Sequence, residues 1–421
     1  MIGEPRIIYV DGVNASVLAR LRRGIPALRR YLYFNWGACG PSPASVVRAV
    51  VRWLDRERDR GPYHPRTVRE RDSLFARVRD QLAEAIGASP AEIALAENAT
   101  EGVNLAASAL RWRRGDEVIL SDREHPSGYL PWFIARDRWG VRVKVVPTGD
   151  GAADFLARVG EALTPRTRAV CVSHVAWLNG ERLPVEALAP LCRRRGAILC
   201  VDGAQTLGHI PFEVHRQGCD LYALSGQKWL MAPQGTGALW VRRGLWEELD
   251  LPLAGWRSGE SRLATLTFDP WPDARRFELA TASAALVAGL SEALALHARL
   301  GGEAIELRVR SLASRLVACL RDIPGVELLT PLGRGPLPAP TGLVSFRIPG
   351  MEAEDAVETL FRRARAVVRS VPAEPAAVRV SCHYLNREEE VEALAEHIAA
   401  LARRGARASS QGRGSRSRAR G

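Results

Sequence analysis

The chain has 421 residues, of which 47% are hydrophobic and 25% are charged, and its formal net charge is +12. This is the composition of a globular protein with room for two or three domains, which excludes a wholly disordered chain. No apolar run approaches the roughly 18 residues of a membrane-spanning helix, and the N-terminus lacks a signal-peptide pattern, so we expect a cytoplasmic protein that does not enter a membrane.

Much of the positive charge lies at the C-terminus. Residues 402–421 carry seven arginines and no acidic side chain. A segment rich in Gly, Ser and Arg cannot bury apolar surface, so residues 404–421 are predicted to form a disordered tail. Nucleic-acid association through this tail is an alternative of a different class, and a solvated tail without a role is favoured over it.

After an N-terminal segment at residues 1–30, the hydrophobic pattern predicts a large α/β domain at residues 31–287. Two helices are expected first, at 43–58 and 67–86. Short apolar strands are expected at 93–96, 117–120, 141–146, 169–173, 197–201, 220–224 and 237–241. Helices between them are expected at 100–111, 127–138, 153–163 and 184–195. This alternation is typical of a mostly parallel sheet with helices on both faces.

A smaller α+β domain is expected at residues 288–403. The composition changes at residues 269–273, where DPWPD indicates a loop, and a long helix at 282–299 follows it. The further elements expected are helices at 303–321, 354–365 and 387–403 and strands at 326–329, 342–347 and 378–382.

The seven cysteines do not form a recognisable disulfide framework or zinc site. None of them occur as C-x-x-C, their number is odd, and several lie inside apolar runs. We therefore expect ordinary buried thiols and no metal site.

Lysine is rare in this chain, and its position is informative. Only Lys144 and Lys228 occur among 59 basic residues. Lys228 follows the strand expected at 220–224 and precedes the apolar residues 229–231. Removal from water favours the neutral, nucleophilic amine that a Schiff base requires. The pattern alone leaves a functional lysine and a surface charge equally open.

Asp202 stands directly after the apolar strand expected at 197–201, at the end of the strand where α/β sheets bind ligands. It could cap a turn, or it could pair with a heterocyclic nitrogen. A strand-end aspartate followed by a strand, a loop and Lys228 is the arrangement that pyridoxal phosphate requires. The run AENATEGVN at a helix start could bind the phosphate, although an ordinary threonine cap also explains it. Ser225 could add a hydroxyl.

Eight sequence blocks support this interpretation, because they occur in the same order as in a known enzyme family. They are YFNWGACGPSP, AENATEGVN, SDREHPSGYLPW, VSHVAWLNG, VDGAQTLG, ALSGQKWLMAPQGTGALWVRR, RRFELAT and VRVSCHYLN. From about residue 31 to residue 400, the chain resembles the class V aminotransferase family of pyridoxal phosphate enzymes, which includes cysteine desulfurases and isopenicillin N epimerase-like proteins. The resemblance implies the aspartate aminotransferase-like fold, with a mostly parallel mixed sheet in the large domain and a smaller α+β C-terminal domain.

The resemblance also implies catalytic roles for three residues. Lys228 would form the aldimine with pyridoxal 5'-phosphate, Asp202 would pair with the pyridine nitrogen, and His125 would stack on the ring. Gln205 would lie near the ring oxygen.

Further residues match contacts to the phosphate, to a second subunit and to the substrate. The remaining residues expected to contact the cofactor are Thr100, Glu101, Ser225 and Gln227. Thr281 would reach the phosphate of a neighbouring subunit, which implies a homodimer with active sites at its interface. Arg379 would bind the carboxylate of an amino-acid substrate, for which a planar guanidinium is suited.

Three departures from the family pattern bear on the reaction. Gln227 stands where desulfurases commonly have histidine, and Trp177 stands where they have asparagine, which leaves the ring oxygen to Gln205. Residues 367–375, VVRSVPAEP, lack the cysteine that desulfurases present on a mobile loop, and Cys382 lies beyond them. The main expectation is a transaminase or isopenicillin N epimerase-like enzyme, and the alternative is a carbon–sulfur lyase or cysteine desulfurase.

Overall fold

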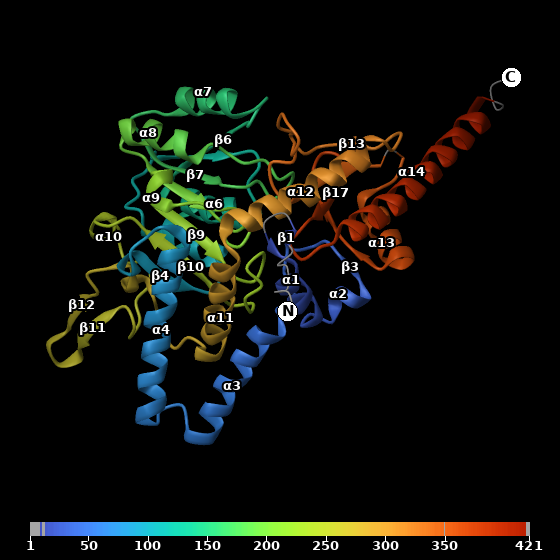
Figure 1. Cartoon of the computed structure of the whole chain (residues 1–421). Coiled ribbons are helices and arrows are strands. Elements are labelled where there is room, and N and C mark those ends of the chain that lie inside the picture. The colour runs from blue at the N-terminus through green and yellow to red at the C-terminus, as the bar shows by residue number, and fades with distance from the viewer. Residues whose placement is uncertain (1–8, 11–12, 349, 418–421) are drawn as a thin grey trace. The chain divides into compact units, whose positions relative to one another are not determined.

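The computed structural model describes residues 9–10, 13–348 and 350–417, and its ribbon is shown in Figure 1. The chain forms two compact units. The smaller unit takes its residues from Met1–Pro43, Trp177–Arg182 and Leu300–Gly421, and the larger unit consists of Ala44–Ala176 and Leu183–Arg299. This division differs from the expected one, because the N-terminal segment joins the C-terminal part and the boundary follows the long helix instead of interrupting it.

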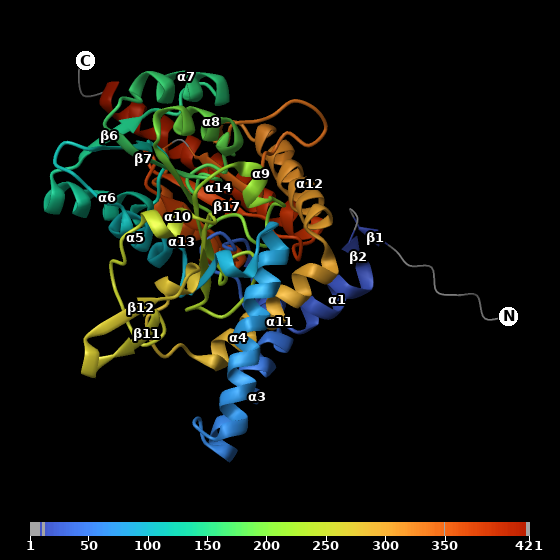
Figure 2. The ribbon, with the colours of Figure 1, turned by 90° about the vertical axis from the view of Figure 1, so that its left-hand side faces the viewer.

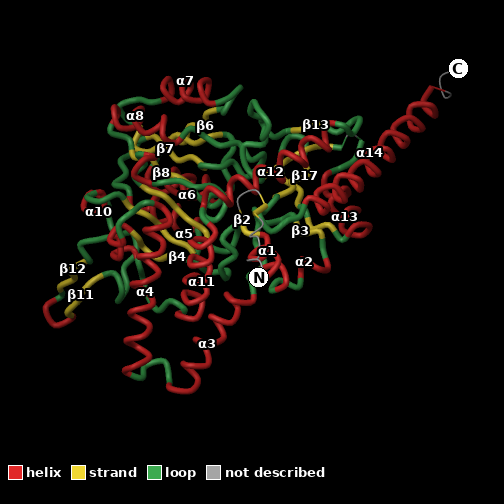
Figure 3. Tube along the Cα trace, viewed as in Figure 1, coloured by secondary structure: helices red, strands yellow, loops and turns green. Residues whose placement is uncertain are grey.

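The larger unit is built on a seven-stranded mixed sheet with the order β4-β10-β9-β8-β7-β5-β6. Strands are drawn in yellow in Figure 3. Its strands are β4 (Ile93–Ala96), β5 (Glu117–Ser121), β6 (Arg142–Val146), β7 (Thr167–Ser173), β8 (Ile198–Asp202), β9 (Leu221–Ser225) and β10 (Gly237–Val241). The strands from β9 to β6 pair in parallel, and β10 is antiparallel to both β9 and β4. The predicted mostly parallel sheet is confirmed.

Helices precede and follow the strands of this sheet, and their succession can be followed in Figure 2. The helices of the larger unit are α3 (Ala44–Arg60), α4 (Pro65–Ile86), η1 (Pro90–Glu92), α5 (Ala99–Ala109), α6 (Pro126–Trp139), α7 (Ala152–Ala162), α8 (Val185–Arg195), α9 (Val214–Gln217), α10 (Leu245–Glu248), η2 (Leu263–Thr265), η3 (Ala274–Phe277) and α11 (Ala284–Leu300). A hairpin of β11 (Gly259–Arg262) and β12 (Thr267–Pro270) was not expected from the sequence.

Both faces of the sheet are buried at the strands β5, β7, β8, β9 and β10, which explains why these strands are mostly apolar runs, whereas the edge strand β6 is largely exposed and carries charged residues. Successive side chains on a strand point to opposite faces. On β5, Val118 and Leu120 belong to the core cluster that includes residues of α5 and α6. Ile119 belongs to the cluster that includes residues of α3, α4 and α8.

The smaller unit is an α+β structure around a four-stranded antiparallel sheet of order β13-β14-β17-β16. Its strands are β1 (Tyr9–Val10), β2 (Val13–Asn14), β3 (Leu32–Tyr33), β13 (Glu327–Leu328), β14 (Leu343–Arg347), β15 (Ala366–Val367), β16 (Arg369–Val371) and β17 (Ala377–Ser381). Its helices are α1 (Ala15–Arg23), α2 (Ala27–Arg30), α12 (Gly302–Arg321), α13 (Ala353–Ala364) and α14 (Glu388–Ser417). β3, which lies within the first stretch of the smaller unit, pairs in parallel with β15.

The Arg-rich C-terminus departs from the expectation of disorder at residues 404–421. Its backbone continues α14 as a helix to Ser417, and residues 418–421 lie outside the described part. No proline interrupts this stretch, and extending a helix that already exists avoids the cost of a new nucleus. Among the described residues, no helix is both long enough and apolar enough to span a membrane.

Candidate active site

Polar side chains collect where the central strands of the large sheet end. β5 ends at Ser121, β7 at Ser173, β8 at Asp202 and β9 at Ser225. Ser173 and Asp202 are direct neighbours in the strand register. Because these strands are parallel, the four residues lie along one edge of the sheet, which is where α/β sheets bind ligands.

Asp202 is a buried acid beside a lysine. Its side chain is 4% exposed, and its Oδ1 accepts a hydrogen bond from the N–H of Ala204 at 2.8 Å. Burial raises the pKa of Asp202, and the positive charge of Lys228 acts in the opposite direction. The structure therefore brings together the two residues that the sequence predicted as the chemical pair of a pyridoxal phosphate site.

Lys228 lies on a tight loop after β9. The N–H of Gly226 donates to the carbonyl of Thr236 at 2.8 Å, and the N–H of Ala232 donates to the carbonyl of Gly226 at 3.0 Å. The N–H of Met231 closes a turn onto the carbonyl of Lys228 at 3.1 Å. Met231 has a φ of 61°, a left-handed conformation that costs a non-glycine residue about 1 kcal/mol. The loop therefore holds the lysine backbone in one conformation.

Gly208 packs against this loop and provides a test of its rigidity. Its φ is +82°, and an added Cβ would lie 2.6 Å from the nitrogen of Leu230. Gly208→Ala combines backbone strain with overpacking, so we expect it to lower the free energy of unfolding by about 3 kcal/mol in urea denaturation. The matched control is Gly244→Ala, because Gly244 has a φ of +84° and open space at its Cβ. The control should cost about 1 kcal/mol, and equal losses would contradict the clash.

Gln205 is oriented by a residue whose role the sequence did not reveal. The indole N–H of Trp229 donates to Oε1 of Gln205 at 2.8 Å. Trp229 in turn stacks on His209, with ring centroids 3.6 Å apart. Trp229 entered the sequence analysis only as an apolar neighbour of the lysine, and the contact depends on a loop closure that local patterns do not encode.

His125 caps the N-terminus of α6. Its Nδ1 accepts a hydrogen bond from the N–H of Ser127 at 3.1 Å, and Pro126 follows at the first helical position. This cap satisfies one of the free N–H groups of the helix start and fixes the ring at the same time. The imidazole is only partly buried, so part of its surface remains accessible to a ligand.

The N-terminus of α5 provides hydrogen-bond donors at the same edge of the sheet. Asn98 caps the helix by accepting from the N–H of Glu101 at 3.0 Å. The N–H of Ala99 donates to Oγ of Ser225 at 3.0 Å, which brings Ser225 to the helix start. The N–H of Thr100 makes no hydrogen bond within the described residues, and its side chain is exposed. The free donor and the positive end of the helix suit a phosphate.

Glu101 and Gln227, which were also expected to contact the cofactor, have different surroundings from each other. The carboxylate of Glu101 accepts from the N–H of Glu97 at 2.6 Å and so closes the start of α5, and burial raises its pKa. Oε1 of Gln227 is buried and has no hydrogen-bond partner in the described part of the chain. A buried carbonyl oxygen without a partner is costly, which fits a site built to receive a polar group.

Thr281 lies in the segment between η3 and α11, within the larger unit. It lines a cavity of about 400 Å³ together with Glu101 and Gly235. The side chain is exposed, and its hydroxyl makes no hydrogen bond to any described residue. Thr281 is therefore accessible, and it makes no hydrogen bond to the other candidate site residues described above.

Arg379 belongs to the smaller unit, where it lies on β17 and is 1% exposed. Its Nη1 donates to the carbonyl of Trp177 at 2.7 Å, whereas Nε and Nη2 have no partner among the described residues. Burial, followed by the charge of Arg369, lowers the pKa of Arg379 to about 9, which leaves it cationic at neutral pH. A buried cation with unused donors is suited to a carboxylate.

Two of the sequence blocks, YFNWGACGPSP and VRVSCHYLN, pack together beside this arginine's strand. Asn35 pairs with Ser381 in a parallel bridge. Trp36 stacks on His383 with centroids 3.9 Å apart and donates its indole N–H to Oδ1 of Asn386 at 3.1 Å. These contacts show that the two blocks, from opposite ends of the chain, support the same strand.

Glu124 is a buried acid that the sequence analysis missed, although it directly precedes the predicted histidine. Ser173 donates its N–H to Oε1 at 2.9 Å and its hydroxyl to Oε2 at 2.7 Å, and Ser121 also donates to Oε1. An added Cβ on Gly128 would lie 3.1 Å from Oε2 of Glu124 and 3.5 Å from Oδ2 of Asp202. The two carboxyl groups therefore approach each other, and burial raises the pKa of Glu124 to about 7.

This pKa makes the stability of the protein depend on pH. An exposed glutamate has a pKa near 4.5, so between about pH 4.5 and 7 the folded state binds more protons at Glu124 than the unfolded state does. The free energy of unfolding then falls as the pH rises through this window, by about 3 kcal/mol in total. In Glu124→Gln this component should be absent. Urea unfolding of the cofactor-free protein at several pH values measures it, and identical slopes for both proteins would contradict it.

Comparison with known proteins extends these observations over most of the chain. The family model described as Aminotransferase class-V matches residues 32–394. The chain is 31% identical over 403 residues to a probable cysteine desulfurase of Methanothermobacter thermautotrophicus, covering 91% of this chain and 97% of that protein. It is 33% identical over 382 residues to isopenicillin N epimerase of Streptomyces clavuligerus, covering 87% and 94%.

Solved structures of one protein, the cystine C–S lyase C-DES, share the fold. The complex of C-DES with its reaction product cysteine persulfide has a TM-score of 0.83 and 30% identity, and covers 89% of this chain and 99% of that chain. A C-DES variant with glycine covalently linked to its pyridoxal phosphate cofactor has the same TM-score and identity, with coverage of 90% and 98%. The similarity therefore includes both units.

Proposed function

Because this chain belongs to the class V aminotransferase family of pyridoxal phosphate enzymes, we propose that it is a carbon–sulfur lyase acting on a sulfur-containing amino acid such as cystine. One observation carries this choice. Residues 367–375 contain no cysteine, and the next one, Cys382, is fully buried. Burial also raises the pKa of the Cys382 thiol, which disfavours the reactive thiolate. A lyase needs no such thiol, whereas a desulfurase does.

The relatives support sulfur chemistry over transamination, which together with isopenicillin N epimerase-like chemistry was the main expectation from the sequence. C-DES is named a cystine C–S lyase, and the relative at 31% identity is named a probable cysteine desulfurase. The relative at 33% identity is named isopenicillin N epimerase, so epimerisation is the second candidate.

In the proposed site, pyridoxal phosphate supplies an electron sink for the electron pair that remains when the α-proton leaves. Lys228 would hold the cofactor, and its Nζ would accept the α-proton of the substrate. The buried Asp202 carboxylate keeps a proton on the ring nitrogen. His125 would stack on the ring, and Gln205 would lie near the ring oxygen.

Other residues bind the two anionic groups. Thr100, Ser225 and the N-terminus of α5 hold the phosphate. Glu101 and Gln227 are the other proposed contacts to the cofactor. Arg379 binds the substrate carboxylate through the donors that the protein does not use. Thr281 reaches the phosphate of the partner subunit in a homodimer.

The proposed reaction breaks the Cα–H and Cβ–S bonds of cystine. The α-proton goes to Lys228, and the sulfur leaves with the electron pair of the Cβ–S bond and is protonated as cysteine persulfide. The remaining three-carbon enamine takes up water to give pyruvate and ammonia. One cystine and one water therefore give one persulfide, one pyruvate and one ammonia, with no external oxidant.

The test is a product balance for the purified holoenzyme with cystine, cysteine and alanine as separate substrates. A lyase should release pyruvate, ammonia and alkylation-trapped persulfide in equal amounts from cystine. Alanine formed from cysteine without pyruvate would indicate a desulfurase. Bleaching of the cofactor band that a keto acid restores would indicate a transaminase, and racemisation without pyruvate an epimerase. Each of these three outcomes overturns the lyase assignment.

The role of Arg379 makes a separate prediction. Arg379→Gln should raise the KM for the amino acid by about 100-fold with a smaller change in kcat, because it removes a charged hydrogen-bond partner from the substrate carboxylate. The matched control is Arg369→Gln, because Arg369 faces Arg379 in the strand register but is exposed. Initial rates across substrate concentrations measure both constants. Equal KM changes in the two variants would remove Arg379 from the binding site.

A further inference from the structure

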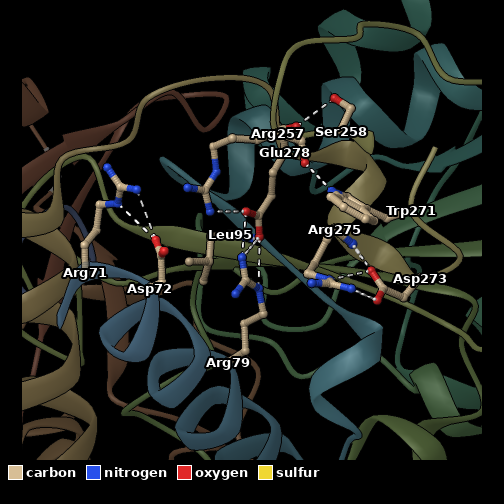
Figure 4. Close-up of polar contacts among 10 residues, drawn as sticks. All are labelled: Arg71, Asp72, Arg79, Leu95, Arg257, Ser258, Trp271, Asp273, Arg275 and Glu278. Carbon is tan, nitrogen blue, oxygen red and sulfur yellow. Dashed lines mark hydrogen bonds and ion pairs between the residues drawn. The ribbon is translucent and has the colours of Figure 1, made fainter. Parts of the chain in front are cut away.

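A buried cluster of opposite charges anchors the segment that carries Thr281. Figure 4 shows Glu278 between Arg79 of α4 and Arg257. Arg79 donates from Nη2 to both carboxylate oxygens at 2.7 Å and from Nε to Oε1 at 3.1 Å. Arg257 donates to Oε2 at 2.9 Å, and the N–H of Leu95 on β4 donates to Oε1 at 3.0 Å. All lone-pair directions of this carboxylate are therefore in use.

The backbone next to Glu278 is held as well. The hydroxyl of Ser258 donates to the carbonyl of Glu278 at 2.7 Å, and the N–H of Arg257 donates to the carbonyl of Leu279 at 3.3 Å. The guanidinium of Arg257 lies over the ring of Phe75, 4.6 Å from its centroid. Hydrogen bonds therefore hold both the side chain of Glu278 and the main chain of Glu278 and Leu279.

Beyond Glu278, the chain passes from a buried to an exposed position within a few residues. Glu278 is buried, whereas residues 280–283 are exposed and run along the cavity of about 400 Å³. At the far end, Oγ of Ser283 accepts from the N–H of Leu286 at 3.4 Å, where α11 begins. The segment is therefore held at both ends, and Thr281 lies in its exposed middle.

We propose that Glu278, held by Arg79 and Arg257, is a positioning residue that presents Thr281 to the cofactor phosphate of the partner subunit. This inference rests on the proposed function of Thr281 in a homodimer. It adds the contacts that hold Thr281 in position. A shift of Glu278 would leave the buried guanidinium of Arg79 and the partly buried guanidinium of Arg257 without their shared counter-ion, which is unfavourable. The cluster thereby restricts the segment before the phosphate arrives, so less conformational freedom is lost on binding.

The first experiment measures cofactor affinity in Glu278→Gln, which keeps the side-chain shape and removes the charge. We expect the dissociation constant for pyridoxal phosphate to rise by about tenfold, the equivalent of one charged hydrogen bond. The matched control is Glu117→Gln, because Glu117 is also buried and pairs with Lys144 at 2.6 Å. It lies at the start of β5, whereas the candidate site lies at the end of that strand. The control should lose stability and keep its cofactor affinity. Equal affinity losses would overturn the positioning role.

The second experiment uses mixed dimers, which separate a role toward the partner from a role within one chain. Differently tagged Glu278→Gln and Lys228→Ala chains are combined, and the cofactor is fixed to Lys228 by borohydride and quantified by mass spectrometry. The only Lys228 in the mixed dimer then receives an intact segment from its partner. Its cofactor affinity should return to within about twofold of the wild-type value. A defect that persists in the mixed dimer would overturn the inference.

Thr281→Val in the same mixed dimers keeps this inference distinguishable from the proposed function. If the Thr281→Val defect is rescued by Lys228→Ala chains and the Glu278→Gln defect is not, the homodimer site stands and the positioning role fails. If neither is rescued, the role of Thr281 toward a partner fails. Should Glu278→Gln not fold, Ser258→Ala replaces it, since it frees the Glu278 carbonyl and leaves the charge cluster intact. The Ser258→Ala defect must then be rescued, or the inference is overturned.

Discussion

Lys228→Ala should lower turnover by at least about 10³-fold, because in the proposed mechanism it removes both the group that holds the cofactor and the base that takes the α-proton. The fold should survive, since the loop around residue 228 is held by backbone hydrogen bonds. Borohydride should no longer fix the cofactor to the protein, which mass spectrometry detects. Turnover near the wild-type value would refute the mechanism as a whole.

The chain provides its own control for this experiment, because it has only one other lysine. Lys144 pairs with Glu117 at 2.6 Å and also donates to the carbonyl of Ala162 at 3.0 Å. Lys144→Ala should therefore cost stability and retain both turnover and borohydride fixation. A loss of fixation in this variant would show that the lysines had been assigned the wrong roles.

Asp202→Asn should lower kcat by roughly 10²–10³-fold, an electrostatic effect of the size seen when a preorganised group is removed from an active site. Asparagine keeps an oxygen for the N–H of Ala204, so the loop after β8 should remain in place. Asparagine cannot carry the negative charge that, in the proposed site, keeps the ring nitrogen protonated. Rates under saturating substrate measure the loss, and the absorbance of the bound cofactor shows whether binding is retained.

Asp220→Asn is the matched control for the loss of an aspartate. Asp220 directly precedes β9, at the opposite end of the strand from the site, where it accepts from the N–H of Leu199 at 2.8 Å and from Nε of Arg242 at 2.7 Å. Removing its charge should affect stability and leave kcat unchanged. If both variants lost activity equally, the effect of Asp202 would be structural.

The sequence predicted the buried part of the fold well because burial on two faces leaves a strong local signal. The bounds of β4 and β10 were predicted residue for residue, and those of β8 within one residue. The hairpin of β11 and β12 was missed because its residues are mostly exposed and carry no apolar alternation. Its existence depends on pairing across a short turn, which the pattern GESRLATLTFDP does not indicate.

The candidate site was predictable where its residues are unusual and unpredictable where they act through contacts. Asp202 and Lys228 could be identified because one ends an apolar strand and the other is one of two lysines. Glu124 and Glu278 carry no such mark, since their importance comes from burial and from partners as distant as Arg79. No local pattern could have revealed those partners.

The division of the smaller unit into three stretches has a consequence for synthesis on the ribosome. The larger unit is complete once Arg299 has been made, whereas residues 1–43 and 177–182 belong to a unit whose remaining strands are encoded later. At about 5–20 residues per second, the first stretch waits for tens of seconds before β14 and β17 emerge. During that interval β3 lacks the strand with which it pairs, so the backbone N–H and C=O groups of its two residues remain unpaired until β15 has been made.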